Sequence, residues 1–149
     1  LLNPLFVINY EGESFATLDM TAINLHTGQC EIMKNGAATT FVKHRDRVET
    51  IVSSALPVGV DMEAEPDVTT VELEDGDMVI MVSDGVLDGF YERNMMDGSQ
   101  DDMSTFIEEL ACQNPNDVAN QILMNALARS TREATDDMSV LVAGIWNKN

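Results

Sequence analysis

The sequence predicts an α+β domain in which antiparallel strands are followed by helices and a closing strand. Three observations predict it. Residues 15–24 alternate between apolar and polar side chains, which is the period-two pattern of a strand. Two strongly apolar runs, residues 79–82 and 140–142, are typical of strands buried on both faces. Between them, residues 115–127 carry an apolar stripe at helical spacing, which predicts an amphipathic helix.

The chain opens with apolar residues at helical spacing, Leu1, Leu2, Leu5 and Phe6. We interpret them as the tail of a helix that begins upstream, so the chain is expected to be a piece of a larger protein. Turn signals then divide residues 15–51 into short strands. We expect these strands to form one continuous antiparallel meander.

The middle of the chain contains a loop signal and a hairpin signal. Residues 53–66 hold two prolines and a glycine and predict a loop. Asp75-Gly76 lies between the apolar residues 68–73 and 78–82, and an Asp-Gly pair in this setting predicts a β-hairpin. The acidic residues gathered here fit turn chemistry and lack the alternating register of a calcium-binding loop.

The second half of the chain contains two helix signals. Residues 89–100 are polar and punctuated by glycine, and we expect irregular chain there. A helical stripe follows at residues 103–110. The last helix is expected to have Asn114 as its N-cap and Pro115 at its first position. Residues 140–145 are expected to form the closing strand.

Composition limits the classes of function. The 149 residues fit one domain, and 26 acidic against 8 basic residues give a net charge of −18. Such a charge repels DNA, RNA and anionic lipid, so a nucleic-acid partner and a membrane contact are not expected. The two cysteines, Cys30 and Cys112, lack the spacing of a disulfide framework. We therefore expect a cytoplasmic segment, whose parent protein has its membrane anchor, if any, elsewhere.

Each apolar run adjoins an aspartate. Asp84 follows the run at residues 79–82, and Asp136 precedes the run at residues 140–142. Carboxylates fixed at strand ends are ligands that hard ions such as Mg²⁺ and Mn²⁺ prefer. Taken singly, each run also fits an ordinary core strand with a polar turn.

Two motifs together resemble a known family. Ser-Asp-Gly-Val-Leu-Asp at residues 83–88, and later Asp-Asp-Met-Ser-Val at residues 136–140, resemble the last two motifs of the metal-dependent serine/threonine phosphatases, the type 2C or PPM family. The closer likeness is to the bacterial branch typified by stage II sporulation protein E. Further motifs fall in the order of that branch, namely Leu18-Asp19-Met20, Gly36-Ala37, Leu56-Pro57-Val58-Gly59 and Glu74-Asp75-Gly76-Asp77.

The resemblance implies that residues 1–149 are the C-terminal portion of a single phosphatase domain, a partial four-layer αββα sandwich of antiparallel sheets. It implies that Asp84 and Asp136 are ligands of one of two Mn²⁺ or Mg²⁺ ions. In this family the ions activate a water that attacks phosphoserine or phosphothreonine, and no catalytic residue beyond the metal ligands is expected. Asp137 is expected to support the ligands, and Asp88 to be a helix N-terminal acid.

The family's first motif, which supplies the ligands of the other ion, is missing from this sequence. We therefore expect the chain alone to bind metal weakly and to hydrolyse little or nothing. The branch implies that the parent's substrate is a phosphorylated regulatory protein, such as an antagonist of an anti-sigma factor.

Two alternatives to an enzyme stay open. One is a catalytically silent phosphatase-like domain that binds a partner. The other is a receiver-type phosphoacceptor domain, suggested by residues 81–85 and opposed by the predicted meander. His26 and His44 lack an acidic or cysteine partner at useful spacing, so we expect surface or turn histidines. Ser83 lacks the surroundings of a catalytic nucleophile.

Overall fold

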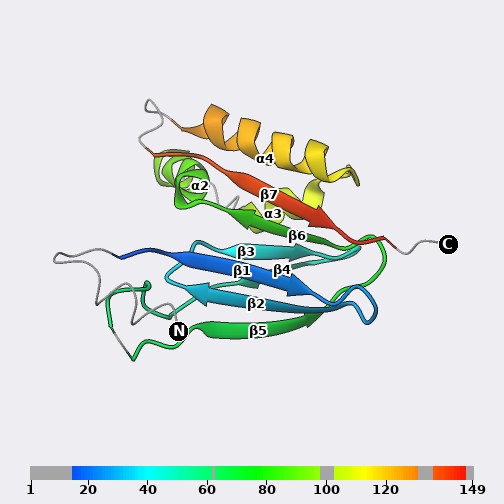
Figure 1. Cartoon of the computed structure of the whole chain (residues 1–149). Helices are drawn as coiled ribbons and strands as arrows, with labels where there is room; N and C mark the ends of the chain where they lie inside the picture. The colour runs from blue at the N-terminus through cyan, green and yellow to red at the C-terminus, as the bar shows by residue number, and fades with distance from the viewer. Residues whose placement is uncertain (1–14, 62, 98–102, 131–135, 147–149) are drawn as a thin grey trace. The chain divides into compact units, whose positions relative to one another are not determined.

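The structure is a computed structural model that describes residues 15–61, 63–97, 103–130 and 136–146. The predicted helix tail at the start of the chain lies outside the described residues, as do residues 131–135 before Asp136. The chain divides into two compact units, one of residues 1–37 and 52–72, the other of residues 38–51 and 73–149. Each unit contains an antiparallel sheet, and helices follow in the second (Figure 1), which confirms the α+β class.

The first unit is built on a three-stranded sheet in the order β1-β2-β5, with β1 at Leu18–Ile23, β2 at Gln29–Asn35 and β5 at Asp67–Glu72. β1 and β2 form a hairpin. Its turn is closed by the side chain of Asn24, which accepts the N–H of His26 at 3.0 Å. Gly28 takes a φ of 79°, a conformation that glycine adopts without steric cost.

One face of this sheet is buried. Cys30 and Ile32 are fully buried on β2, and Lys34 shares their face because alternate residues of a strand point the same way. Lys34 is only 1% exposed, and its ammonium lies 2.5 Å from the carboxylate of Asp19, its register partner on β1. The ion pair satisfies a charge that would otherwise be costly to bury.

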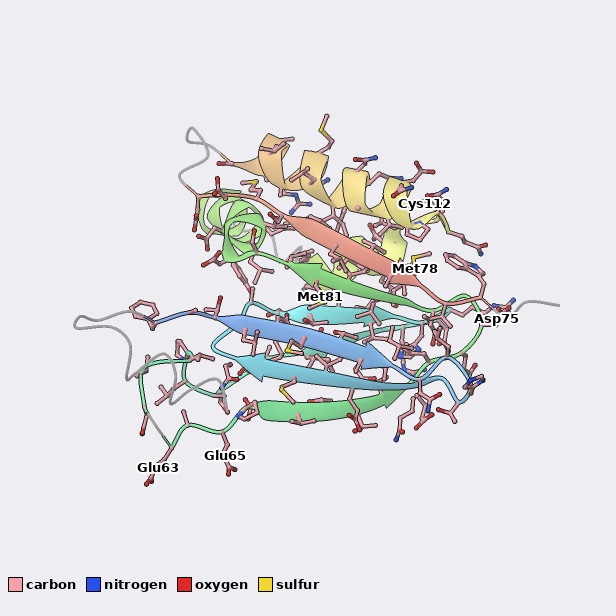
Figure 2. The ribbon with its side chains drawn as sticks, in the orientation of Figure 1. Glu63, Glu65, Asp75, Met78, Met81 and Cys112 are labelled. Carbon is pink, nitrogen blue, oxygen red and sulfur yellow. The ribbon has the colours of Figure 1, made fainter. Side chains whose placement is uncertain are left out.

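The predicted loop at residues 53–66 is confirmed, and one carboxylate holds its first turn. Oδ2 of Asp67 accepts the N–H groups of Ser54 at 2.7 Å and Ala55 at 2.9 Å, together with the hydroxyl of Ser53 at 3.1 Å. These hydrogen bonds favour the charged form and lower the pKa of Asp67. Glu63 and Glu65 lie further along the same loop (Figure 2).

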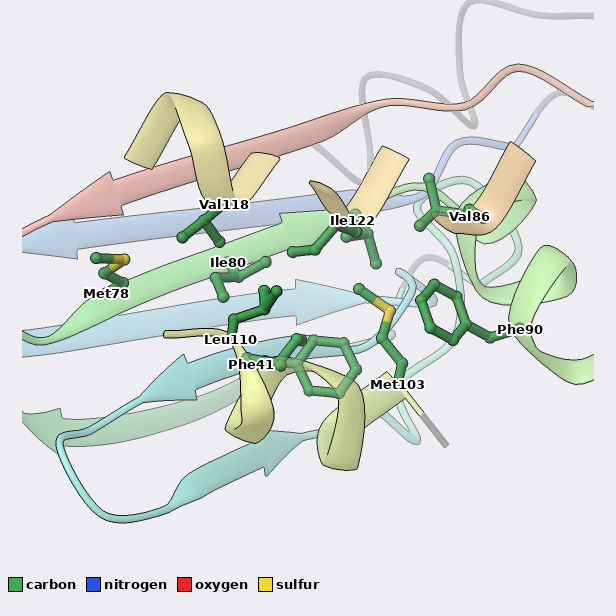
Figure 3. Packing of buried hydrophobic residues seen from close by; sticks show 12 residues of the cluster. Phe41, Met78, Ile80, Val86, Phe90, Met103, Leu110, Val118 and Ile122 are labelled. Carbon is green, nitrogen blue, oxygen red and sulfur yellow. The ribbon is translucent and has the colours of Figure 1, made fainter. Parts of the chain in front are cut away.

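The second unit has a four-stranded sheet in the order β4-β3-β6-β7 and three helices in its described part. Its elements are β3 (Thr40–Lys43), β4 (Val48–Ile51), β6 (Met78–Val82), α2 (Asp84–Asp97), α3 (Met103–Glu109), α4 (Pro115–Arg129) and β7 (Val140–Gly144). Phe41 and Ile80 of the sheet pack against Leu110, Val118 and Ile122 (Figure 3). The same core includes Val82 and Val86, which lie on either side of Asp84, the first residue of α2.

The start of α4 agrees with the sequence. Asn114 is the N-cap, its side chain accepts the N–H of Asn116 at 2.9 Å, and Pro115 is the first helical residue. The stripe at residues 103–110 is also confirmed as α3, with Met103, Ile107 and Leu110 buried. None of the helices in the described ranges has both the length and the apolar character that a membrane crossing requires.

Two predicted strand connections are wrong. The strands of residues 15–51 do not form one meander, because β1 and β2 pair with each other and with β5, while β3 and β4 belong to the other sheet. Asp75-Gly76 does not close a hairpin either, since β5 and β6 lie in different sheets. Gly76 has the positive φ of a turn, 93°, but its N–H donates to the carbonyl of Ile145 beyond β7 at 2.8 Å.

Two local expectations in the second unit also fail. Residues 89–97 are helical and not irregular, because α2 runs from Asp84 to Asp97. β6 is buried on both faces, as predicted, and Figure 2 shows Met78 and Met81 along it. β7 is not, because it is the edge strand of its sheet and Leu141 is 58% exposed.

Candidate metal centre

Asp84 lies where the buried strand β6 gives way to α2. Ser83 separates it from the strand, and Asp84 is the first residue of the helix. Its side chain is exposed, and Oδ1 accepts the N–H of Gly85 at 3.2 Å. A carboxylate in the first turn also interacts favourably with the helix dipole. The strand and the helix start therefore fix the backbone of Asp84 while its carboxylate faces solvent.

Asp136 lies at the same end of the sheet. β6 and β7 are antiparallel, with Val82 paired to Val140, so the end of β6 lies beside the start of β7. Asp136 precedes that start by a short segment and is exposed. Its Oδ1 accepts the N–H of Asp137 at 2.8 Å. The structure thus brings together the two aspartates that the sequence selected.

Ser83 connects the two segments. Its backbone N–H donates to the carbonyl of Ser139 at 3.0 Å, and its hydroxyl donates to the carbonyl of Asp137 at 2.9 Å. The same hydroxyl accepts the N–H of Ser139 at 3.0 Å. The hydroxyl thus has a structural role, and the absence of a nucleophilic role for Ser83 stays a prediction.

Gly85 allows the segments to approach closely. A Cβ at this position would lie 2.8 Å from the carbonyl oxygen of Asp137 and 3.3 Å from that of Asp136. The first contact is shorter than real Cβ atoms show, so only glycine fits here without a shift of backbone. The first turn of α2 therefore rests directly on the backbone of Asp136 and Asp137.

The pair of carboxylates fits part of a hard-ion site. Carboxylate oxygens suit Mg²⁺ and Mn²⁺, and both side chains face solvent at one sheet end. In the described part of the chain, however, no group of three or more His, Cys, Asp or Glu side chains is arranged to hold a metal. An octahedral ion would take its remaining ligands from water or from residues outside the described ranges.

The neighbouring acids differ in their placement. Asp88 was expected at a helix N-terminus, and this is wrong, because the helix begins at Asp84 and Asp88 lies beyond its first turn. Asp88 is exposed on the same face of the helix as Asp84, four residues along. Asp137 is exposed, and its carbonyl accepts from Ser83. Its support of the metal ligands stays a prediction.

The two histidines differ in burial. His26 is exposed in the β1–β2 turn, as expected. His44 contradicts the expectation of a surface residue, because it is 8% exposed and its Nδ1 lies 2.7 Å from Oδ2 of Asp77. Asp77 is itself buried and also accepts the N–H of Glu74 at 2.9 Å. The partners are far apart in the sequence and meet because Lys43 of β3 pairs with Met78 of β6.

Comparison with known proteins identifies the family of the chain. The family described as stage II sporulation protein E (SpoIIE) matches residues 1–146. The chain belongs to the SpoIIE family. The SpoIIE protein of Priestia megaterium is 31% identical over 142 residues, and that of Bacillus subtilis (strain 168) is 27% identical over 144 residues. The chain spans 24% and 17% of their lengths, respectively.

Solved SpoIIE structures share the fold. The phosphatase domain of the cell fate determinant SpoIIE from Bacillus subtilis, presoaked with Mn, matches 99% of this chain with a TM-score of 0.77 at 24% identity, and the match covers 64% of that chain. A structure of the SpoIIE PP2C phosphatase domain with a fragment of its regulatory domain matches 94% of this chain, and 41% of that chain, with a TM-score of 0.78 at 26% identity. The type 2C phosphatase-like α+β fold is therefore shown.

The direction of the strands removes one alternative. A receiver-type domain needs a parallel sheet with alternating strands and helices. Both sheets in the described residues are antiparallel, which contradicts that reading.

Proposed function

We propose that the natural protein containing this chain is a metal-dependent phosphatase that acts on phosphoserine or phosphothreonine of a protein. The observation that carries the proposal is the meeting of Asp84 and Asp136 at one sheet end, joined through Ser83. The SpoIIE family membership and the fold shared with SpoIIE phosphatase domains support it.

In this proposal the chain's own residues bind and orient. Asp84 and Asp136 are the ligands of one divalent ion, Mn²⁺ or Mg²⁺, in a site for two. Ions bound there would supply a water of lowered pKa as the nucleophile and would offset negative charge on the phosphoryl oxygens. β6, α2 and the Ser83 hydrogen bonds hold the backbone that carries the two carboxylates, so that little backbone entropy is lost when the ion binds.

Two aspartates alone make a weak site, because Mg²⁺ gives up its water reluctantly. We therefore propose that the chain by itself binds metal weakly and hydrolyses little or nothing. Isothermal titration of the chain with Mn²⁺ is expected to show weak binding. Tight binding of two ions would contradict this part of the proposal.

The proposed substrate is a phosphorylated regulatory protein, such as an antagonist of an anti-sigma factor, acting in the cytoplasm. A phosphorylated protein is anionic, and the chain has a net charge of −18. Bound cations would have to offset that charge where the substrate approaches. The substrate class thus depends on the metal centre.

The test is the substitution Asp84→Asn in the whole natural protein that contains this chain. Mn²⁺-dependent release of phosphate from a phosphoserine protein is expected to fall by orders of magnitude. Asp46→Asn is the matched control, because Asp46 is exposed in the turn between β3 and β4, at the other end of the sheet. Unchanged turnover would remove Asp84 from the site, and no turnover in the unaltered protein would favour a catalytically silent binding domain.

A further inference from the structure

Three helices meet at the guanidinium of Arg129, the last residue of α4. Its Cζ lies 4.7 Å from the ring centroid of Phe90 on α2 and 6.0 Å from that of Phe106 on α3. The two rings are themselves 5.5 Å apart and inclined by 54°. A guanidinium over aromatic faces is attracted by their quadrupoles and stacks on them.

The stacking is the main described contact of this group. Nε and Nη1 of Arg129 are buried and find no hydrogen-bond acceptor among the described residues. Burying donors without acceptors is costly, so the position has to be favoured by other contacts. The ring faces supply these, and a cation at the last turn of a helix also interacts favourably with the dipole of α4.

The backbones of α2 and α4 touch beside this cluster. A Cβ on Gly89 would lie 2.7 Å from the carbonyl oxygen of Ala126, one turn before Arg129. Gly85, four residues earlier on the same face of α2, makes the equivalent contact with Asp137. α2 therefore packs against the backbone of α4 at Ala126 and against the backbone of Asp136 and Asp137. Phe90, next to Gly89, is 1% exposed and adds a buried side chain to this contact between α2 and α4.

We propose that Arg129 is a positioning residue for the metal centre, an inference that rests on the proposed function. By stacking on Phe90 it fixes α2 against the end of α4, and so fixes Asp84, the first residue of α2, relative to Asp136. Mg²⁺ demands near-ideal octahedral geometry and Mn²⁺ prefers the same octahedral oxygen ligands, so a shift of α2 by a fraction of an ångström weakens the site. Arg129 itself touches neither metal nor substrate.

The experiment uses Arg129→Met in the whole natural protein that contains this chain. Mn²⁺ affinity is measured from free Mn²⁺ by electron paramagnetic resonance. The Kd is expected to rise about tenfold, the loss typical of residues that support metal ligands. Turnover at saturating Mn²⁺ is expected to stay within about twofold of the unaltered protein, because the ligands are intact. Arg47→Met is the control, since Arg47 is 63% exposed on its side chain and is expected to leave the Kd unchanged.

Two further variants test whether Arg129 acts on the metal centre by stacking, by its charge or by stabilising the fold in general. Arg129→Lys keeps the charge but not the planar stack, so its Kd is expected to match that of Arg129→Met. Phe90→Leu removes the ring. The double variant Phe90→Leu with Arg129→Met is expected to bind Mn²⁺ no more weakly than either single variant. A purely structural role would instead lower the melting temperature of the metal-free protein and leave the Kd of the folded protein unchanged.

The outcomes distinguish this inference from the function on which it rests. If the unaltered protein binds no Mn²⁺, the proposed function fails. If it binds Mn²⁺ and Arg129→Met has the same Kd, the positioning role is overturned while the function stands. If Arg129→Met does not fold, the Kd values of Arg129→Lys and Phe90→Leu decide, and unchanged values in both overturn the role.

Discussion

The hydroxyl of Ser83 donates to the carbonyl oxygen of Asp137 at 2.9 Å and so ties the end of β6 to the segment that carries Asp136. The hydroxyl also accepts the N–H of Ser139. These two bonds add to the backbone hydrogen bond from the N–H of Ser83 to the carbonyl of Ser139, just beyond the last paired residues, Val82 and Val140. The Ser83 side chain is therefore one of the contacts that hold the segments of Asp84 and Asp136 together.

Ser83→Ala removes these two hydrogen bonds. We expect the free energy of unfolding to fall by about 1 kcal/mol for each bond lost. The Mn²⁺ Kd of the whole protein is expected to rise about tenfold, because the segments that carry the ligands lose a connection. Urea unfolding and Mn²⁺ titration measure the two effects.

Ser139→Ala is the control for this prediction. Ser139 makes its contacts to Ser83 through its backbone, which the substitution leaves in place. An equal loss of Mn²⁺ affinity in both variants would contradict the role assigned to the Ser83 hydroxyl.

The buried pair of His44 and Asp77 makes a second prediction. His44→Ala removes the partner of a carboxylate that is 3% exposed. We expect a loss of about 2–4 kcal/mol in the free energy of unfolding, since among the described residues the carboxylate of Asp77 then keeps the N–H of Glu74 as its donor. His26→Ala, in an exposed turn, is expected to change it by no more than about 0.5 kcal/mol. Similar values for both in urea unfolding would show that the pair contributes nothing.

Asp67 gives a prediction on pH. Hydrogen bonds from the backbone of Ser54 and Ala55 lower its pKa in the folded protein. A carboxyl whose pKa is depressed by folding contributes stability above its unfolded pKa of about 4, and this contribution is lost as the pH falls through the folded pKa.

Asp67→Asn is isosteric and does not titrate. The unaltered protein is therefore expected to be more stable than this variant at neutral pH, and the difference should shrink below about pH 4. Urea unfolding at a series of pH values measures it. A difference that stays constant from neutral pH down to strongly acidic pH would contradict the assigned hydrogen bonds.

Local signals predicted the elements whose causes are local. The N-cap at Asn114 with Pro115 placed α4 correctly, and the apolar run at residues 79–82 identified a strand buried on both faces. Asp84 and Asp136 were selected by their place beside apolar runs together with the family resemblance, and the strands that they adjoin prove to be paired, while their role as metal ligands stays a prediction. An aspartate next to an apolar run is a signal that a sequence can show.

Long-range pairing was not readable from the same signals. Asp75-Gly76 has the composition of a hairpin turn, yet its amide bonds to Ile145, because the strands on either side belong to different sheets. Leu141 is as apolar as its neighbours, and only the position of β7 at the sheet edge leaves it exposed. His44 and Asp77 likewise meet only through the pairing of β3 with β6.

The most direct test of the metal centre is Mn²⁺ titration of the whole natural protein with Asp84→Asn, Asp136→Asn and both together. If the two carboxylates share one ion, each single substitution weakens that ion's binding at least about tenfold, and the double substitution is hardly weaker than the singles. Unaltered Mn²⁺ affinity in both single variants would contradict the account.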